Sequence, residues 1–267
     1  MAFGPDNRFQ PTQSAWTQPL GRAATDAATL DAGLRAYMLR VYNWMASGLA
    51  LTAITAYLIA NTPGIREMFF TIGRSARGNI VTQPTILGFA AIFAPLVFVL
   101  VLSFGINRLS KTSAQALFWA FCVAMGASMA NIFVVYVGAS VASTFFVTAG
   151  MFAAVSIYGY TTKADLTRMG GFLMMGLIGI IIAGLVNMFF QSSALQFAIS
   201  VIGVVVFVGL TAFDTQRIKN DYLEYAYAEG GDEAAKRSVI DALGLYLNFV
   251  NLFQLLLQFM GVRSSSD

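Results

Sequence analysis

The feature that most constrains this chain is a series of long apolar runs without charge. Seven runs follow one another along the sequence, at residues 41–60, 86–106, 114–137, 141–160, 170–190, 195–213 and 239–260. The first six contain no Asp, Glu, Lys or Arg. A helix of about 18 or more such residues is long enough to cross roughly 30 Å of hydrocarbon. The sequence therefore predicts an all-α integral membrane protein with seven transmembrane helices.

Composition agrees with a membrane protein and excludes several kinds of chemistry. Charged residues make up 11% of the 267 residues, whereas a soluble domain carries about 25%. The absence of histidine removes imidazole metal ligands and the usual proton shuttle near neutral pH. We interpret Cys122, the single cysteine, as a small core residue, and we expect no cofactor. The net charge of +3 comes from basic residues at the ends of the runs, which indicates topology rather than a nucleic-acid partner.

Three regions follow from this pattern. Residues 1–34 are polar and contain three of the six prolines, so we expect a disordered tail without a secretory signal. Residues 35–262 form the predicted seven-helix transmembrane domain, and residues 263–267 form a short C-terminal tail. If the N-terminus is cytoplasmic, 12 of the 16 Lys and Arg residues fall in inner segments and four in outer segments. The positive-inside rule therefore favours a cytoplasmic N-terminus and an external C-terminus.

Polar side chains are rare within the runs, so the few that occur are candidates for function. Asp214 follows directly on the sixth run, and Asp241 lies near the start of the seventh. On a helix, Asp241 and Asn248 fall about 20° apart. Asn251, Gln254 and Gln258 extend this polar stripe, and Leu and Phe occupy the opposite side. The stripe should face other helices or water, and its spacing is compatible with either a polar bundle interior or an ion path.

Several motifs resemble those of one family. They are FDTQRIK within residues 207–219, LYLNFVNLF at 245–253, LRAYMLRVYNWMASGLALT at 34–52 and SIYGYTTKADL at 156–166. In this order they resemble the Bax inhibitor-1 (transmembrane Bax inhibitor motif) family over residues 34–261. The resemblance implies a bacterial inner-membrane protein whose seventh helix is central and surrounded by the other six. It also implies a Ca²⁺-permeable leak that responds to pH, with membrane lipid and cations as partners.

The resemblance also implies specific site residues. In the family, two aspartates hold the closed state through a hydrogen bond, and Asp214 matches the first of them. An arginine at the cytoplasmic end of the second helix matches Arg108, or falls at the neighbouring Asn107. The second aspartate is replaced by Asn248 in this chain. Two close carboxylates cannot easily both ionise, so such a pair titrates as a unit, whereas an aspartate and an asparagine lack that repulsion.

We therefore predict that Asp214 stays ionised near neutral pH, paired with Arg108, and that the leak responds weakly to pH. Asp241 is a poor replacement partner, because seven helical residues place it about 10 Å from Asn248 along the axis. A single carboxylate cannot supply the six to eight oxygens of a tight Ca²⁺ site, so we expect only transient binding at Asp214.

Two other functions remain open from the sequence. The chain could be a non-conducting regulatory protein that binds other membrane proteins through its tail or through the charged segment at residues 214–241. An intramembrane aspartyl enzyme needs two adjacent carboxylates, and Asn248 removes the obvious pair. We therefore expect that the protein is not an enzyme. A cation leak with its gate at Asp214 is the leading hypothesis.

Overall fold

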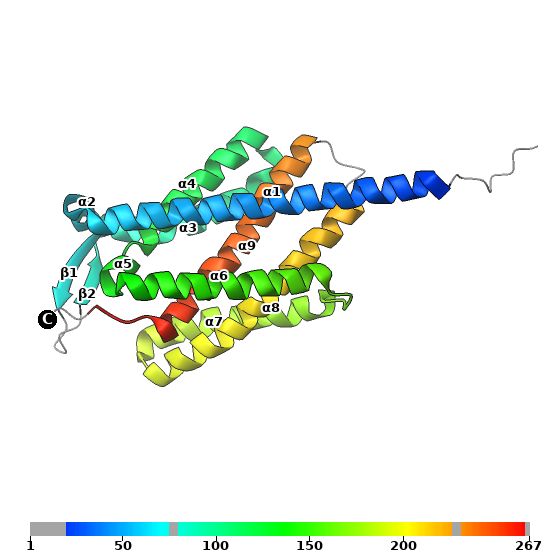
Figure 1. Cartoon of the computed structure of the whole chain (residues 1–267). Helices are drawn as coiled ribbons and strands as arrows, with labels where there is room; N and C mark the ends of the chain where they lie inside the picture. Colours follow the sequence, from blue (N-terminus) through cyan, green and yellow to red (C-terminus); the bar gives the residue numbers. More distant parts are fainter. Residues whose placement is uncertain (1–19, 75–79, 226–230, 265–267) are drawn as a thin grey trace, which may run out of the picture.

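A computed structural model describes residues 20–74, 80–225 and 231–264 of the chain (Figure 1). Within these residues, seven helical segments are long and apolar enough to cross a membrane, which confirms the number predicted from the apolar runs. The helices are α1 (Leu20–Asn61), α3 (Ile86–Gly105), α4 (Lys111–Met129), α6 (Gly138–Thr161), α7 (Thr167–Phe190), α8 (Ser193–Tyr225) and α9 (Gly231–Met260).

Short elements join these helices. They are α2 (Pro63–Phe69), the strands β1 (Phe70–Arg74) and β2 (Ile80–Pro84), the 3₁₀ turn η1 (Ile106–Arg108), and α5 (Ile132–Val135). The two strands pair antiparallel, with Phe70 opposite Pro84. The apolar runs did not predict this hairpin, because it lies between two spans and is short and partly polar. Thr85 joins the hairpin to α3: its hydroxyl accepts a hydrogen bond from the Gly88 amide at 3.2 Å and thereby caps the helix.

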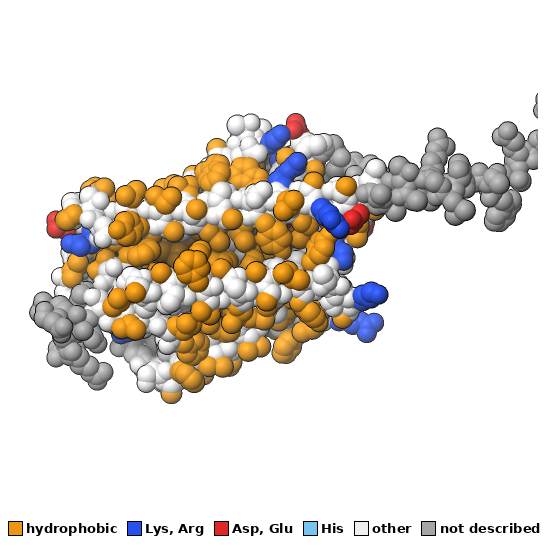
Figure 2. Space-filling view, viewed as in Figure 1, with side chains coloured by type: hydrophobic (Ala, Val, Ile, Leu, Met, Phe, Trp, Pro, Cys, Tyr) orange, Lys and Arg blue, Asp and Glu red, His pale blue; other side chains and the backbone are white. Residues whose placement is uncertain are grey.

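The bundle has two ends and an apolar middle. The chain enters α1 at one end, here called the N-terminal end, which also holds the α6–α7 and α8–α9 connections (Figure 1). The opposite, C-terminal end holds the hairpin and the last described residues. On the face shown in Figure 2, Lys and Arg side chains gather at the two ends and apolar side chains cover the middle. Large apolar residues such as Phe189 (82% exposed) and Met175 (74% exposed) cover the outside, as expected for contact with lipid.

Helix α9 is the most buried of the seven spans. In its most apolar window, 72% of the residues are buried, whereas the other spans range from 11% for α7 to 39% for α4 and α8. Its main packing partners are α1, α4, α6 and α8, while α3 packs mainly on α4 and α7 on α8. The structure thus places α9 inside the bundle among four helices. The finer expectation, a seventh helix enclosed by all six others, stays a prediction.

Helix boundaries differ from the sequence-based expectation in two places. The tail predicted to be disordered up to Leu34 is helical from Leu20, because Ala-rich residues 20–34 favour a helix that continues into the first span. Residues 1–19 of that tail lie outside the described residues. The charged segment between the sixth and seventh spans is largely helical as well, since α8 continues to Tyr225 and α9 begins at Gly231. Asp214 therefore lies inside a helix and not at its end.

Candidate functional site

Asp214 and Asn248 meet in the interior, near the N-terminal end of the bundle. The Asn248 Nδ2 amide donates a hydrogen bond of 2.6 Å to Asp214 Oδ2, which joins α8 to α9 across 34 residues of sequence. Both residues are buried, at 9% and 6% exposure. An amide bonded to a buried carboxylate is a charge-assisted contact, stronger than a bond between two neutral groups. The sequence analysis predicted this pair from the family motifs, and the structure brings the two side chains together.

The second oxygen of Asp214 is paired with Arg217 and not with Arg108. Arg217 NH1 lies 3.0 Å from Asp214 Oδ1, one turn along α8. The Arg217 side chain is 45% exposed, whereas that of Asp214 is 12% exposed. Arg108 is an exposed residue of η1, and among the described residues no ion pair joins it to Asp214. The predicted partnership between Asp214 and Arg108 is therefore corrected to Asp214 and Arg217.

Asp241 is hydrogen-bonded to α1, whereas the acceptor of the Asn248 amide is Asp214. Tyr37 of α1 donates its phenolic hydroxyl to Asp241 Oδ2 at 2.6 Å. The two residues are 204 positions apart in sequence, and Asp241 is 7% exposed. The Tyr37 ring packs in turn against Tyr222 of α8, with ring centroids 5.0 Å apart. Asp241 thus joins α9 to α1, while Asn248 joins α9 to α8.

The FDTQRIK motif also holds the connection between α6 and α7. Gln216 accepts a hydrogen bond from the Leu166 amide and donates one to the Ala164 carbonyl, both at 2.8 Å. Lys219 donates to the Tyr160 carbonyl at 2.8 Å, where α6 approaches its C-terminus and leaves carbonyls unpaired. Four residues of this one helical stretch therefore have defined partners: Asp214, Gln216, Arg217 and Lys219. The motif acts as a junction between α8, α9 and the α6–α7 connection.

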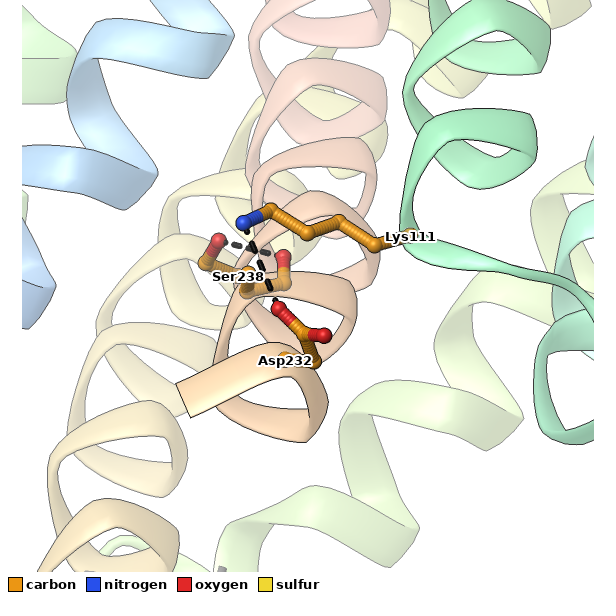
Figure 3. A network of polar contacts seen from close by, with 4 residues as sticks. Lys111, Asp232 and Ser238 are labelled. Atoms are coloured by element: carbon orange, nitrogen blue, oxygen red, sulfur yellow. Dashed lines mark hydrogen bonds and ion pairs between the residues drawn. The ribbon is translucent and has the colours of Figure 1, made fainter. Parts of the chain in front are cut away.

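A further polar contact ties α4 to α9 at the same end (Figure 3). Lys111, in the first turn of α4, points towards Asp232 in the first turn of α9, with 3.4 Å between Nζ and Oδ1. Ser238 donates to the Ala235 carbonyl of its own helix at 2.7 Å. Both side chains of the ion pair are largely exposed, at 45% and 83%. A pair of this kind contributes little to stability, about 0–1 kcal/mol, so the contact positions α4 and α9 only weakly.

Sequence reasoning missed Arg217, Gln216 and Tyr37. A signal for Arg217 was present, because an acid and a base three positions apart on a helix lie on the same face. The sixth apolar run ends at residue 213, however, so hydropathy alone does not indicate that the helix continues through Asp214 and Arg217. No local signal identifies Tyr37 as the partner of Asp241, since a contact across 204 residues depends on how α1 packs against α9.

These features define a class: a multi-pass helical membrane protein with a buried cluster of charged and amide side chains near one end of its bundle. Comparison with known proteins agrees and is more specific. The chain belongs to the Bax inhibitor-1 family, since the family model described as inhibitor of apoptosis-promoting Bax1 matches residues 34–265.

Bacterial relatives cover nearly the whole chain. An uncharacterized protein of Caulobacter vibrioides is 46% identical over 235 residues, which are 87% of this chain and 91% of the relative. The inner membrane protein YbhL of Escherichia coli is 46% identical over 232 residues, 87% of this chain and 94% of the relative. A Rickettsia prowazekii protein is 44% identical over 236 residues, 88% of this chain and 93% of the relative.

Proposed function

We propose that this chain is a Ca²⁺-permeable cation leak of a bacterial inner membrane, with its gate between α8 and α9 at Asp214. The observation that carries the proposal is the buried contact between Asp214 and Asn248, at 2.6 Å, near the end that the charge distribution assigns to the cytoplasm. Ionisable groups inside a membrane bundle are costly and commonly line ion or proton paths. The family membership and the named inner-membrane relative support the membrane and the class.

In this proposal the two contacts of Asp214 keep the gate closed. Asp214 has one oxygen bonded to Asn248 and the other paired with Arg217. A cation that approaches Asp214 would meet the positive guanidinium first. Because the Arg217 side chain is already half exposed, its guanidinium can move away from Asp214 and become fully hydrated. Opening would then require Arg217 to leave Asp214, which exposes one carboxylate to a passing cation and allows weak, transient binding.

The pH response of this gate should be weak. Asn248 cannot share a proton with Asp214, so the contact does not depend on a titrating carboxylate pair. Asp241 is a second acid on the same helix, but it is bonded to Tyr37 and lies about 10 Å from Asn248 along the helix axis. It therefore does not take the place of the family's second aspartate. Placing an aspartate at position 248 should restore the titrating pair.

The test is Ca²⁺ flux into liposomes that contain the purified full chain, at pH 6, 7 and 8. The wild-type protein should leak with little change across this range. Arg217→Gln should leak faster, because it removes the cation that covers Asp214, and Asp214→Asn should leak more slowly, because it removes the charge that attracts Ca²⁺. Asn248→Asp should make the flux depend on pH. Lys111→Gln, which removes only the exposed pair with Asp232, is the matched control.

Two results would overturn the proposal. If all variants and the wild type are as impermeable as empty liposomes, the chain is not a leak under these conditions, and the non-conducting regulatory function takes precedence. If the protein leaks but Arg217→Gln, Asp214→Asn and the Lys111→Gln control behave alike, a conduction path exists whose gate is elsewhere. Folding of each variant is checked by its elution from a sizing column before reconstitution.

A further inference from the structure

An apolar groove runs along the membrane-facing side of the bundle between α1 and α6. It has a volume of about 760 Å³, and a second cavity of about 260 Å³ continues it towards the C-terminal end. Among the described residues, helices α1 and α6 both pack extensively on α9 and make far less contact with each other. Leu49, Ala53, Phe145 and Phe249 line both cavities, so the two form one continuous groove. Figure 2 looks onto this face, where apolar side chains lie along both walls.

The walls of the groove suit a hydrocarbon chain. Small side chains of α1 (Ala46, Ala50) and of α6 (Ala149, Ala153) leave the space, and Phe249 of α9 lies at its inner side. The volume lies within the roughly 300–1,000 Å³ typical of sites that bind small molecules. From Arg35 to Ala53 the groove follows 18 residues of α1, or about 27 Å, close to the thickness of a hydrocarbon core.

Three polar side chains at the N-terminal end of the groove follow the order of the parts of a phospholipid, while the hydroxyl of Thr52, in the second cavity, is already bonded to Cys122 and Tyr246. Arg35 is exposed at the rim and forms an ion pair with Asp31 at 3.3 Å. Both of those side chains are more than half exposed, so this pair is weak and Arg35 can take another anion. Tyr160 lines the same end, with the ammonium group of Lys219 5.2 Å from its ring centre.

Ser156 provides an independent observation. It lies one helical turn deeper than Tyr160, lines the groove and is 5% exposed, yet its hydroxyl has no hydrogen-bond partner among the residues that the structure describes. A buried hydroxyl without a partner costs free energy, and most native hydroxyls in such positions are satisfied by a protein group, water or a ligand. In a glycerophospholipid the ester carbonyls lie just below the phosphate, so they would reach Ser156 when the phosphate is at Arg35.

We propose that this groove binds an anionic glycerophospholipid from the leaflet at the N-terminal end, with one acyl chain between α1 and α6, the phosphate at Arg35 and an ester carbonyl at Ser156. Arginine is suited to this role, because its planar guanidinium donates two parallel hydrogen bonds to a phosphate. The groove would then be a specific lipid site, unlike the outer face of α7, whose exposed apolar residues face lipid without such polar groups. The proposal does not depend on ion conduction.

The experiment uses the full chain in liposomes of phosphatidylglycerol or of phosphatidylcholine, each with a trace of the same lipid carrying a photoactivatable acyl chain. Adducts are mapped to peptides by mass spectrometry. We expect adducts on α1 and α6 around Ala50 and Ala153 to be several-fold denser than on α7. Ala50→Phe combined with Ala153→Phe should fill the groove and reduce its labelling to the level of α7. Ile182→Phe, on the exposed face of α7, should leave the labelling of the groove unchanged.

The headgroup is tested separately, in case the filled variant does not fold. Arg35→Gln should reduce the preference for phosphatidylglycerol about fivefold, the change expected from one basic side chain near an anionic headgroup. Arg168→Gln, an exposed arginine at the same end on α7, should keep the preference. Equal labelling of α7 and the groove, or an unchanged headgroup preference in Arg35→Gln, would overturn the proposal. Cross-links in the groove to a second copy of the chain would also overturn it.

Discussion

At its N-terminal end α9 meets its neighbours through charged groups, whereas near its C-terminal end it meets α8 through neutral ones. Asp214 and Asp241 are both buried, and each accepts a short hydrogen bond, from Asn248 and from Tyr37. At the other end Gln258 accepts hydrogen bonds from Gln196, at 2.6 Å, and from Ser200.

The two clusters differ in what can change them. The C-terminal cluster extends through Gln196 to Asn187 of α7, whose amide donates at 2.9 Å, and it contains no ionisable group among these residues. Its contacts therefore do not depend on pH or on a mobile counterion. The N-terminal cluster combines buried acids with the half-exposed Arg217, so a movement of one side chain changes its charge balance. The contacts at the N-terminal end can therefore respond to a change in charge, whereas those at the C-terminal end cannot.

The largest effect should follow removal of the acid that both Asn248 and Arg217 contact. Asp214→Leu leaves the buried Asn248 amide without its acceptor, which costs about 1–3 kcal/mol, and it also removes the ion pair with Arg217. Because Arg217 is half exposed, water replaces part of that pair, and we expect a total loss of about 2–3 kcal/mol. The thermal unfolding midpoint in detergent measures this loss. A midpoint equal to that of the wild type would mean that the contact does not hold α8 to α9.

The second contact at this end should have a smaller effect. Tyr37→Phe keeps the ring that packs on Tyr222 but removes the hydroxyl that Asp241 accepts from. Leaving a buried carboxylate without this donor should cost about 1–2 kcal/mol, read from the same unfolding midpoint. Tyr222→Phe is the control, since it removes a hydroxyl from the neighbouring ring. Equal losses in the two variants would mean that the hydrogen bond from Tyr37 to Asp241 contributes no more than the hydroxyl of the neighbouring ring, which would contradict the prediction.

The neutral cluster, in which Gln196 and Gln258 are both exposed, should tolerate substitution better than the two buried contacts. Gln258→Leu removes the acceptor used by Gln196 and Ser200. Hydrogen bonds between transmembrane helices contribute about 0.6 kcal/mol on average, and the exposed Gln196 can turn to other partners. We expect a loss of about 0.6 kcal/mol and an unchanged Ca²⁺ flux. A faster leak in Gln258→Leu would place part of the gate at the C-terminal end and break the contrast between the two ends.

Much of the architecture could be predicted from the sequence, because the length and charge of an apolar run are local properties. All seven spans are where the runs placed them, and Cys122 is buried as interpreted. The contact of Asp214 with Asn248 was accessible only through the family motifs, since it joins two helices. Hydropathy did not reveal where α8 and α9 continue beyond the apolar core, because their charged turns resemble a solvated loop. For this reason the sequence did not predict the ion pair between Asp214 and Arg217, which depends on α8 continuing as a helix.

The glycines of α7 also show which features of packing the composition of a helix predicts and which it does not. Their abundance predicts a seam where helices approach closely. At Gly170 and Gly176 the prediction is right, since an added Cβ would meet Phe213 and Val206 of α8 at 2.7 and 2.9 Å. At Gly171, Gly179 and Gly184 nothing lies within 4 Å. Composition thus identified the helix that carries a seam but not which side of it packs, because that depends on the position of α8.

The smallest effect is expected at Asp165, an acid outside the membrane at the N-terminal end of the bundle. Its substitution distinguishes the titration of a surface acid from changes in the buried cluster. Where α7 begins, the Thr167 side chain and the Thr167 amide, the latter at 2.9 Å, donate hydrogen bonds to Asp165, and these bonds lower the pKa of Asp165 below its usual value near 3.8. The resulting stabilisation is present above that usual value and is lost as the pH falls through the lowered pKa. Asp165→Asn should therefore lower the unfolding midpoint slightly from pH 6 to 8, where the wild-type carboxylate is ionised, and this difference should disappear as the pH falls below about 4. Between pH 6 and 8 the difference between the two proteins should stay constant, and a difference that varies with pH in this range would mean that the α6–α7 connection, held by Gln216, couples Asp165 to the buried cluster.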